Sequence, residues 1–396
     1  MMIRTLAAAF ALILTTLPAQ AFDTKASSAF VIDQTTGTVL LAKNADQPLP
    51  PASMSKLMTL YMAFEALGDG RLTLNEELPV SQHAMDYKGS TLFLKAGERV
   101  PVESLIRGII VLSGNDACAV IAEALSPDGT EAGFARLMTQ RAVKMGMTNS
   151  TFANSNGWPQ AGHLMSMRDL ALLSNRLITD FPQYYPLFAE KEYLFDPNEA
   201  SNRYNRNPLL GLGIGADGLK TGHTQEAGYG LTGSAVQDDR RIIFVLSGME
   251  TANARAEEAE AIVNWAFRQF AQRPLGKAGQ RVAQADVWMG EAASVGLTLD
   301  ADLTVLLPIL AGDEVAAEVV YTGPVKAPVT QGDTLAELVL KPEGLPEIRV
   351  PLVAEASVAP AGFVAKVSAV ALILLDRLNR GPEDAPEAAP AAEVAS

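Results

Sequence analysis

Two strand-like segments open the regular part of the chain, and long helical patterns follow them. Residues 29–33 and 38–42 have the composition of strands, and the polar residues 34–37 between them predict a hairpin. Residues 53–67 are apolar on nearly every face, which is typical of a helix buried in a core. Similar periodic patterns predict further helices at residues 102–112, 116–125 and 167–177.

Strand-like residues return in the second half of the chain. Residues 229–236 and 241–248 predict two strands joined by a polar turn, and residues 257–270 predict a helix after them. Near residue 273 the composition changes to short β-rich runs separated by Gly, Pro and Asp. This change predicts a small all-β domain over residues 273–360, after a first domain that mixes helices and strands.

The N-terminal end of the chain carries a targeting pattern. Arg4 precedes an apolar run at residues 6–17, which is shorter than the roughly 20 residues that span a bilayer. The small-residue pattern Ala19-Gln20-Ala21 follows this run. Together they predict a secretory signal peptide over residues 1–21, with a membrane anchor as the alternative.

The C-terminal end carries an amphipathic pattern. Residues 361–380 place apolar side chains at i, i+3, i+4 and i+7, with charged residues on the other side and at the far end. The pattern predicts a helix that lies in a membrane interface. Docking of this helix on its own protein is the alternative, because tertiary packing uses the same periodicity. Residues 381–396, rich in Pro, Ala and Glu, predict a disordered acidic tail.

Charge and composition narrow the class of function. The chain has 31 basic and 45 acidic residues and a formal net charge of -14, which argues against a nucleic-acid partner. Cys118 is the single cysteine, so an internal disulfide is excluded. With three histidines and no H-E-x-x-H motif, we expect no metal site and no cofactor.

The motif Ser53-Met54-Ser55-Lys56 places a hydroxyl and an amine three residues apart at the start of the predicted buried helix. This spacing brings both side chains to one helix face, within hydrogen-bonding reach. A lysine is a base only when it is uncharged, and burial beside another cation lowers its pKa in that direction. The motif alone is weak evidence for an activated serine, since about one chance match is expected in a chain of this length. The alternative is an N-cap serine beside a solvated lysine.

A second motif, Ser113-Gly114-Asn115, lies where the predicted helix over residues 102–112 ends and a loop begins. Such a loop can present both polar side chains to a cleft. Ser113 could pass a proton between Lys56 and a leaving amine, while Asn115 could hydrogen-bond a substrate peptide group and hold Lys56 in place. By itself the triplet is an ordinary turn.

A third motif, Lys220-Thr221-Gly222-His223-Thr224, lies at the start of the second strand region. The lysine and the threonine hydroxyl there can bind a substrate carboxylate. Gly222 leaves room for close backbone approach, which would let an extended peptide lie along the strand. The alternative is a charged lysine on an edge strand.

The three motifs together are far more specific than any one of them. An S-x-x-K, an S-D-N-like triplet and a K-T-G are the signature of class A β-lactamases and penicillin-binding proteins. In their order and spacing the chain resembles the low-molecular-mass penicillin-binding proteins that act as serine D-alanyl-D-alanine carboxypeptidases, peptidase family S11. Gly114 stands where β-lactamases have Asp, which is the carboxypeptidase pattern.

The resemblance covers residues 22–272 and implies both a fold and a mechanism. The fold is an α/β (α+β) penicillin-binding or β-lactamase-like domain, an antiparallel sheet with a helical cluster. In the mechanism Ser53 attacks the D-Ala-D-Ala carbonyl, D-alanine leaves with a proton relayed by Lys56 and Ser113, and water hydrolyses the acyl-enzyme. The oxyanion would lie between the backbone N–H groups of Ser53 and His223. β-Lactam antibiotics mimic the dipeptide and would acylate Ser53.

Members of this family also bind the terminal carboxylate region through arginines, and Arg206 and Arg255 stand at the matching places. Arg255 is the better candidate, because it follows the strand expected to neighbour Lys220. Pro208, shortly after Arg206, departs from the family pattern. A surface salt bridge is the alternative role for either arginine.

Other functions with the same fold stay open. A β-lactamase of class A would need an E-x-x-x-N loop between Ser113 and Lys220, and the sequence has none. A D,D-endopeptidase would use the same serine chemistry, and a catalytically silent peptidoglycan-binding protein would keep the fold alone. The signal peptide and the interfacial helix together predict a periplasmic protein attached peripherally to the outer face of the cytoplasmic membrane.

Overall fold

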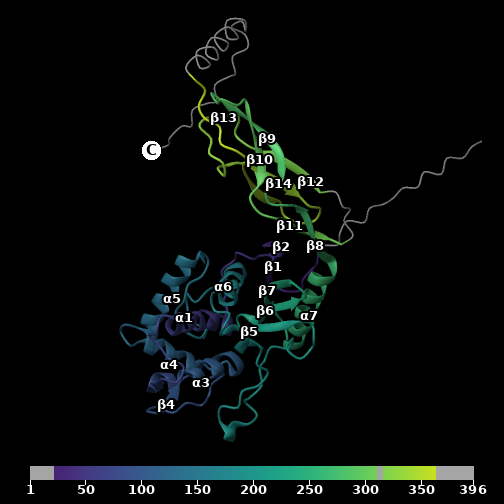
Figure 1. The fold of residues 1–396 in the computed structure, drawn as a ribbon. Coiled ribbons are helices and arrows are strands. Elements are labelled where there is room, and N and C mark those ends of the chain that lie inside the picture. The colour runs from purple at the N-terminus through teal and green to yellow at the C-terminus, as the bar shows by residue number, and fades with distance from the viewer. Residues whose placement is uncertain (1–21, 310–314, 363–396) are drawn as a thin grey trace, which may run out of the picture. The chain divides into compact units, whose positions relative to one another are not determined.

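The computed structural model describes residues 22–309 and 315–362, which form two compact units (Figure 1). The first unit comprises the described residues up to Ala271 together with residues 306–309 and 343–346, and the second comprises the rest. The predicted signal peptide, residues 363–380 of the predicted amphipathic helix and the predicted acidic tail lie outside the described residues. Within the described ranges, no helix combines the length and the apolarity needed to cross a bilayer.

An antiparallel sheet forms the centre of the first unit. Its strand order is β2-β1-β7-β6-β5, so that β5 is an edge strand. The strands are β1 (Ser28–Asp33), β2 (Val39–Lys43), β5 (Ala216–Thr224), β6 (Gly228–Gln237) and β7 (Arg240–Met249). The predicted hairpin is confirmed as β1 and β2, and both strands predicted in the second half are confirmed as β6 and β7.

The alternation of side chains along the strands separates two cores. On β7, Phe244 and its same-face neighbours pack against α7 (Ala252–Gln269), while Ile243 and Val245 face a cluster of helices on the opposite side of the sheet. Figure 1 shows α7 on one side of the sheet and α1 and α6 on the other. The cluster contains α1 (Lys56–Gly68), α2 (Gln82–Met85), α3 (Val102–Arg107), α4 (Asn115–Leu125), α5 (Glu131–Met145) and α6 (Met167–Asp180).

Shorter elements connect these helices and strands. The 3-10 turns are η1 (Ala52–Ser55), η3 (Tyr185–Ala189) and η4 (Pro197–Glu199), η2 (Gly108–Leu112) is a wide π turn, and β3 (Glu77–Pro79) pairs with β4 (Arg99–Pro101). The single helix predicted at residues 102–112 is therefore wrong in its second half, which widens into the π turn. The helix predicted from residue 257 begins five residues earlier as α7, because the Thr251 hydroxyl caps it by accepting a hydrogen bond from the Ala254 N–H.

The second unit is built from strands. Its six-stranded sheet has the order β12-β14-β15-β10-β9-β13, and only the contact between β13 and β9 is parallel among the pairs described. The strands are β9 (Arg281–Trp288), β10 (Ser294–Leu299), β12 (Ala316–Val320), β13 (Val325–Lys326), β14 (Thr334–Lys341) and β15 (Ile348–Ala354). β8 (Phe270–Gly276) and β11 (Leu303–Pro308) pair in a sheet of their own. The predicted all-β fold of this region is confirmed, although the pattern missed the strands β8, β10 and β13.

Candidate active site

Ser53 lies in the 3-10 turn η1. This turn directly precedes α1, whose first residue is Lys56. The side chain of Lys56 is fully buried, and its Nζ lies 2.9 Å from the Oγ of the half-buried Ser53. Spacing along a helical turn thus brings the two groups together, as the sequence pattern requires.

Two further oxygens surround the amine of Lys56. Nζ lies 2.7 Å from Asn115 Oδ1 and 2.6 Å from the backbone carbonyl of Asn156. Both oxygens are acceptors, and the Asn115 amide is oriented because its Nδ2 donates to the carbonyl of Lys88 at 2.7 Å. An uncharged amine can donate its two N–H groups to these two oxygens, which leaves its lone pair for the hydroxyl proton of Ser53.

The uncharged form of Lys56 is accessible. Burial lowers the pKa of Lys56 from 10.5 to about 8, and the positive charge of Arg206 acts in the same direction. The negative charges of Asp116 and Glu131 act in the opposite direction. A base with a pKa of about 8 is present in its uncharged form in part at neutral pH and mostly at mildly alkaline pH.

Ser113 follows the π turn η2 in a left-handed backbone conformation, with φ of 63°. Its side chain is buried, and its Oγ has no hydrogen-bond partner within the described chain. Leaving a buried hydroxyl unpaired is unfavourable by about 1–3 kcal/mol. The arrangement suits a hydroxyl whose partner is a substrate group.

Lys220 and Thr221 are buried on the edge strand β5. Burial lowers the pKa of Lys220 well below its ordinary value, and the charges of Lys56 and Arg206 act in the same direction. The Nζ of Lys220 donates to the carbonyl of Thr221 at 3.2 Å. Since β5 ends the sheet, one side of its backbone lacks a strand partner and can accept an extended peptide.

Gly222 makes room for a different neighbour from the one expected. A Cβ at this position would lie 2.9 Å from the carbonyl oxygen of Pro51 and 3.1 Å from Met54 Cγ. The missing side chain therefore allows β5 to pack against the segment that carries Ser53. Room for a substrate backbone is not needed to explain this glycine.

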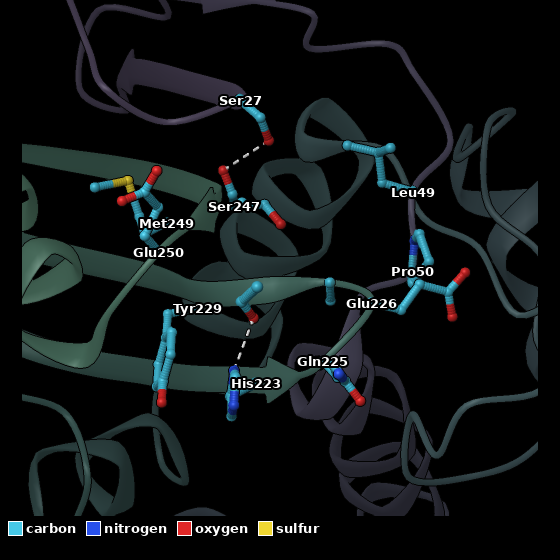
Figure 2. A pocket seen from close by; sticks show the side chains of 13 residues that line it. Ser27, Leu49, Pro50, His223, Gln225, Glu226, Tyr229, Ser247, Met249 and Glu250 are labelled. Atoms are coloured by element: carbon cyan, nitrogen blue, oxygen red, sulfur yellow. Dashed lines mark hydrogen bonds between the residues drawn. The ribbon is translucent and has the colours of Figure 1, made fainter.

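His223 is exposed, and its ring stacks on Tyr229 of β6 at a centroid distance of 3.7 Å (Figure 2). Its Nδ1 lies 3.2 Å from the carbonyl oxygen of Gly228. His223 also lines a pocket of about 580 Å³. Figure 2 shows the side chains around this pocket. Its walls come from the turn between β5 and β6, the end of β7 and two segments near the N-terminus of the first unit.

The two candidate arginines differ in burial. Arg206 is exposed and donates from Nη1 to the Oγ of Ser90, while Arg255 is buried on α7 with its guanidinium 5.8 Å from the centre of the Tyr229 ring. Neither arginine forms an ion pair with a carboxylate of the described chain, and the Nε of Arg255 has no hydrogen-bond partner there. The strand before Arg255, β7, was expected to neighbour the strand that carries Lys220. This expectation is wrong, because β6 separates β7 from β5. Arg255 is connected to β5 through Tyr229 of β6, because its guanidinium lies over the Tyr229 ring and this ring stacks on His223.

The motifs missed one segment that contacts the amine. The carbonyl of Asn156 lies in a polar loop, Asn154-Ser155-Asn156-Gly157, whose composition predicts a turn but gives no sign of its partners. Gly157 has φ of +81°, and a Cβ there would lie 1.8 Å from the carbonyl oxygen of Ala52. The loop therefore packs directly on the turn that carries Ser53.

The chain is similar to known proteins over most of its length. A family model described as D-alanyl-D-alanine carboxypeptidase, peptidase S11, matches residues 15–251, and one described as the C-terminal domain of penicillin-binding protein 5 matches residues 270–360. The D-alanyl-D-alanine carboxypeptidase DacF of Bacillus subtilis is 34% identical over 349 residues, which are 86% of this chain and 87% of the relative. DacA of Escherichia coli is 33% identical over 350 residues, 86% of each chain. The solved structure of penicillin-binding protein 5 from Haemophilus influenzae has a TM-score of 0.74 at 29% identity and covers 86% of this chain and 99% of that one.

Proposed function

The chain belongs to the D-alanyl-D-alanine carboxypeptidase family of serine peptidases, S11, and on this premise we propose that it removes the terminal D-alanine from peptidoglycan stem peptides. The observation that carries the proposal is the set of contacts around the Lys56 amine. Asn115 and Asn156 take up its two N–H groups, so that its lone pair is directed at the hydroxyl of Ser53.

In the proposed reaction the uncharged Lys56 amine accepts the Ser53 proton while Ser53 Oγ attacks the penultimate D-alanine carbonyl. The tetrahedral oxyanion is stabilised by the backbone N–H groups of Ser53 and His223. The C–N bond then breaks, and the leaving amine of D-alanine takes a proton from Lys56 through the Ser113 hydroxyl. Water hydrolyses the ester of Ser53 and restores the free serine.

The terminal carboxylate of the substrate is assigned to the cationic end of the site. Lys220 and the Thr221 hydroxyl lie on the edge strand, and Arg206 and Arg255 add positive charge nearby. A charge-assisted hydrogen bond to a carboxylate contributes about 1.5–3 kcal/mol. Asn115 and the backbone of β5 are assigned to the peptide groups on the acyl side.

Acylation of Ser53 and release of D-alanine test this function together. Purified protein is incubated with penicillin and analysed by mass spectrometry, and D-alanine is measured after incubation with diacetyl-Lys-D-Ala-D-Ala. We expect one covalent adduct on the peptide that contains Ser53, and no adduct with Ser53→Ala. Covalent labelling of Ser53→Ala at the unmodified rate would refute the assignment.

Product analysis distinguishes the related activities. A carboxypeptidase releases D-alanine from a pentapeptide, whereas a D,D-endopeptidase also converts cross-linked dimers to monomers. We expect slow hydrolysis of the penicillin adduct, because the sequence has no E-x-x-x-N loop of the class A β-lactamase kind between Ser113 and Lys220. Rapid steady turnover of a chromogenic β-lactam would instead support a β-lactamase.

For domain organisation and location we propose an exported enzyme with five parts. Residues 1–21 would be a signal peptide, 22–272 the catalytic domain, 273–360 a β-rich domain, 361–380 a peripheral membrane anchor and 381–396 an acidic tail. The cell-wall substrate of the family supports a location outside the cytoplasmic membrane. Removal of residues 363–396 should leave D-alanine release unchanged and shift the protein from the membrane fraction to the soluble fraction, and unchanged partition would contradict the anchor.

A further inference from the structure

Glu131 is a buried carboxylate behind the candidate active site, at the first residue of α5. Its side chain is 6% exposed, and each of its oxygens has two partners. Oε1 accepts hydrogen bonds from the backbone N–H of Ser155 at 2.9 Å and from the Ser155 hydroxyl. Oε2 accepts from the Tyr87 hydroxyl at 2.6 Å and lies 2.7 Å from His83 Nε2.

These contacts keep Glu131 charged. Burial by itself would raise the pKa of Glu131, but the hydrogen bonds from Ser155 and Tyr87 outweigh it and lower the pKa below its ordinary value. Charge-assisted hydrogen bonds to a carboxylate are about twice as strong as those between neutral groups. Glu131 is therefore a firm anchor for the backbone of Ser155.

Asn156, the residue after Ser155, contacts the amine of Lys56. The carbonyl of Asn156 lies 2.6 Å from Lys56 Nζ, one residue beyond the N–H that Glu131 binds. The carbonyl of Ser155 accepts from the Thr59 hydroxyl at 2.5 Å, which ties the same segment to α1. On the other side, Gly157 packs against Ala52 with no room for a side chain. The chain has little freedom to move the Asn156 carbonyl while these anchors hold.

We propose that Glu131 is a positioning residue for the acyl-transfer reaction: by binding Ser155, it holds the Asn156 carbonyl against the Lys56 amine and so directs the amine's lone pair at Ser53. This role rests on the proposed function of Ser53 and Lys56. Glu131 does not contact the reacting atoms. Without the carbonyl, one N–H of the amine would lose its acceptor, and the lone pair would no longer have a fixed direction.

The charge of Glu131 has a second, separable effect. A buried negative charge favours the charged form of Lys56, so Glu131 raises the pKa of Lys56 relative to a neutral residue at the same place. Other titratable groups face Lys56 or Glu131 from the elements around them and are unchanged in the two Glu131 variants below. They are His83, Tyr87, Asp116, Cys118, Glu123, His163, Arg206 and Lys220.

Two variants separate position from charge. Glu131→Asp keeps the charge but shortens the side chain by one methylene, which withdraws the carboxylate from Ser155. Glu131→Gln keeps the length but removes the charge. Glu123→Gln is the matched control, because Glu123 accepts from the Ser81 hydroxyl at 2.8 Å and has no hydrogen bond to the loop at Ser155.

The measurement is the single-turnover rate constant for acylation by a fluorescent penicillin between pH 6 and pH 10. A rate constant of this kind is independent of the fraction of protein that has folded. For Glu131→Asp we expect the acylation rate constant to fall roughly ten- to a hundredfold, as for a misplaced catalytic group. The acid limb of its pH profile should not move. For Glu131→Gln we expect a fall together with a shift of the acid limb to lower pH. Glu123→Gln should match the unmodified enzyme.

The outcomes distinguish the proposal from a structural role. If the folded fraction of both Glu131 variants is acylated with the unmodified rate constant and the unmodified pH profile, Glu131 only supports the fold and the proposal is overturned. Ser155→Ala gives a second test, because it removes one hydrogen bond to Glu131 and should give a smaller loss of rate. Failure of the proposed function would look different, since the unmodified chain itself would then form no adduct at Ser53.

Discussion

The buried amine of Lys56 should make the stability of the first unit depend on pH in a specific direction. In the folded protein the pKa of Lys56 is lowered from 10.5 to about 8, chiefly because burial disfavours the charged form. The unfolded chain therefore binds more protons than the folded one between these two values. It follows that the free energy of unfolding reaches its full value above pH 10.5 and decreases as the pH falls toward 8.

The size of the effect follows from the two pKa values. Replacing Lys56 by Met keeps the length of the side chain but removes the titrating group. Stability of the unmodified protein, relative to Lys56→Met, should rise by about 2 kcal/mol between roughly pH 7 and pH 9.5. The variant also leaves Asn115 Oδ1 and the Asn156 carbonyl without their donor, but that cost is a constant offset and does not change with pH.

Urea unfolding followed by tryptophan fluorescence measures this difference. The chain has three tryptophans, of which Trp288 lies in the second unit, so a Trp288→Phe background leaves Trp158 and Trp265 to report on the first unit alone. The same pKa should appear in the acylation rate, which should fall about tenfold per pH unit below pH 8 and level off above it. A stability difference that stays flat between pH 7 and pH 9.5 would refute the argument that burial keeps Lys56 uncharged.

Three further substitutions test single contacts. Ser113→Ala removes a buried hydroxyl that has no hydrogen-bond partner in the described chain. The thermal midpoint of unfolding should therefore stay the same or rise slightly, while the rate of acylation should fall by roughly 10²–10⁴. A marked loss of stability would mean that the Ser113 hydroxyl has a structural partner. Gly222→Ala should lower the free energy of unfolding by about 1–3 kcal/mol and slow acylation, because its Cβ would press on the carbonyl oxygen of Pro51. An unchanged free energy of unfolding and an unchanged acylation rate would show that β5 can shift to make room. Arg255→Gln should raise KM for a D-Ala-D-Ala substrate by roughly ten- to a hundredfold with little change in kcat. It should leave the rate for the matching D-alaninamide substrate almost unchanged, and equal losses for both substrates would exclude Arg255 as a carboxylate ligand.

Most of the regular elements could be predicted from local pattern. Strand-like composition and the polar turns between the segments identified β1, β2, β6 and β7, and apolar residues on nearly every face identified α1 as a buried helix. Errors occurred where neighbouring residues do not decide the structure. The π turn at Gly108–Leu112 interrupts an otherwise helical run, and nothing in its apolar composition distinguishes it from the helix before it.

The pairing of Ser53 with Lys56 follows from local sequence, because a spacing of three residues along a helical turn brings two side chains together whatever the rest of the protein does. The surroundings of that pair depend on how distant segments of the chain pack. Asn115 and Asn156 lie 59 and 100 residues from Lys56, and Glu131 acts through Ser155, so their contacts depend on how α1, α4, α5 and the loop at Ser155 pack. The sheet order likewise placed β6 between β7 and β5, which local pattern cannot reveal since it specifies strands and not their neighbours.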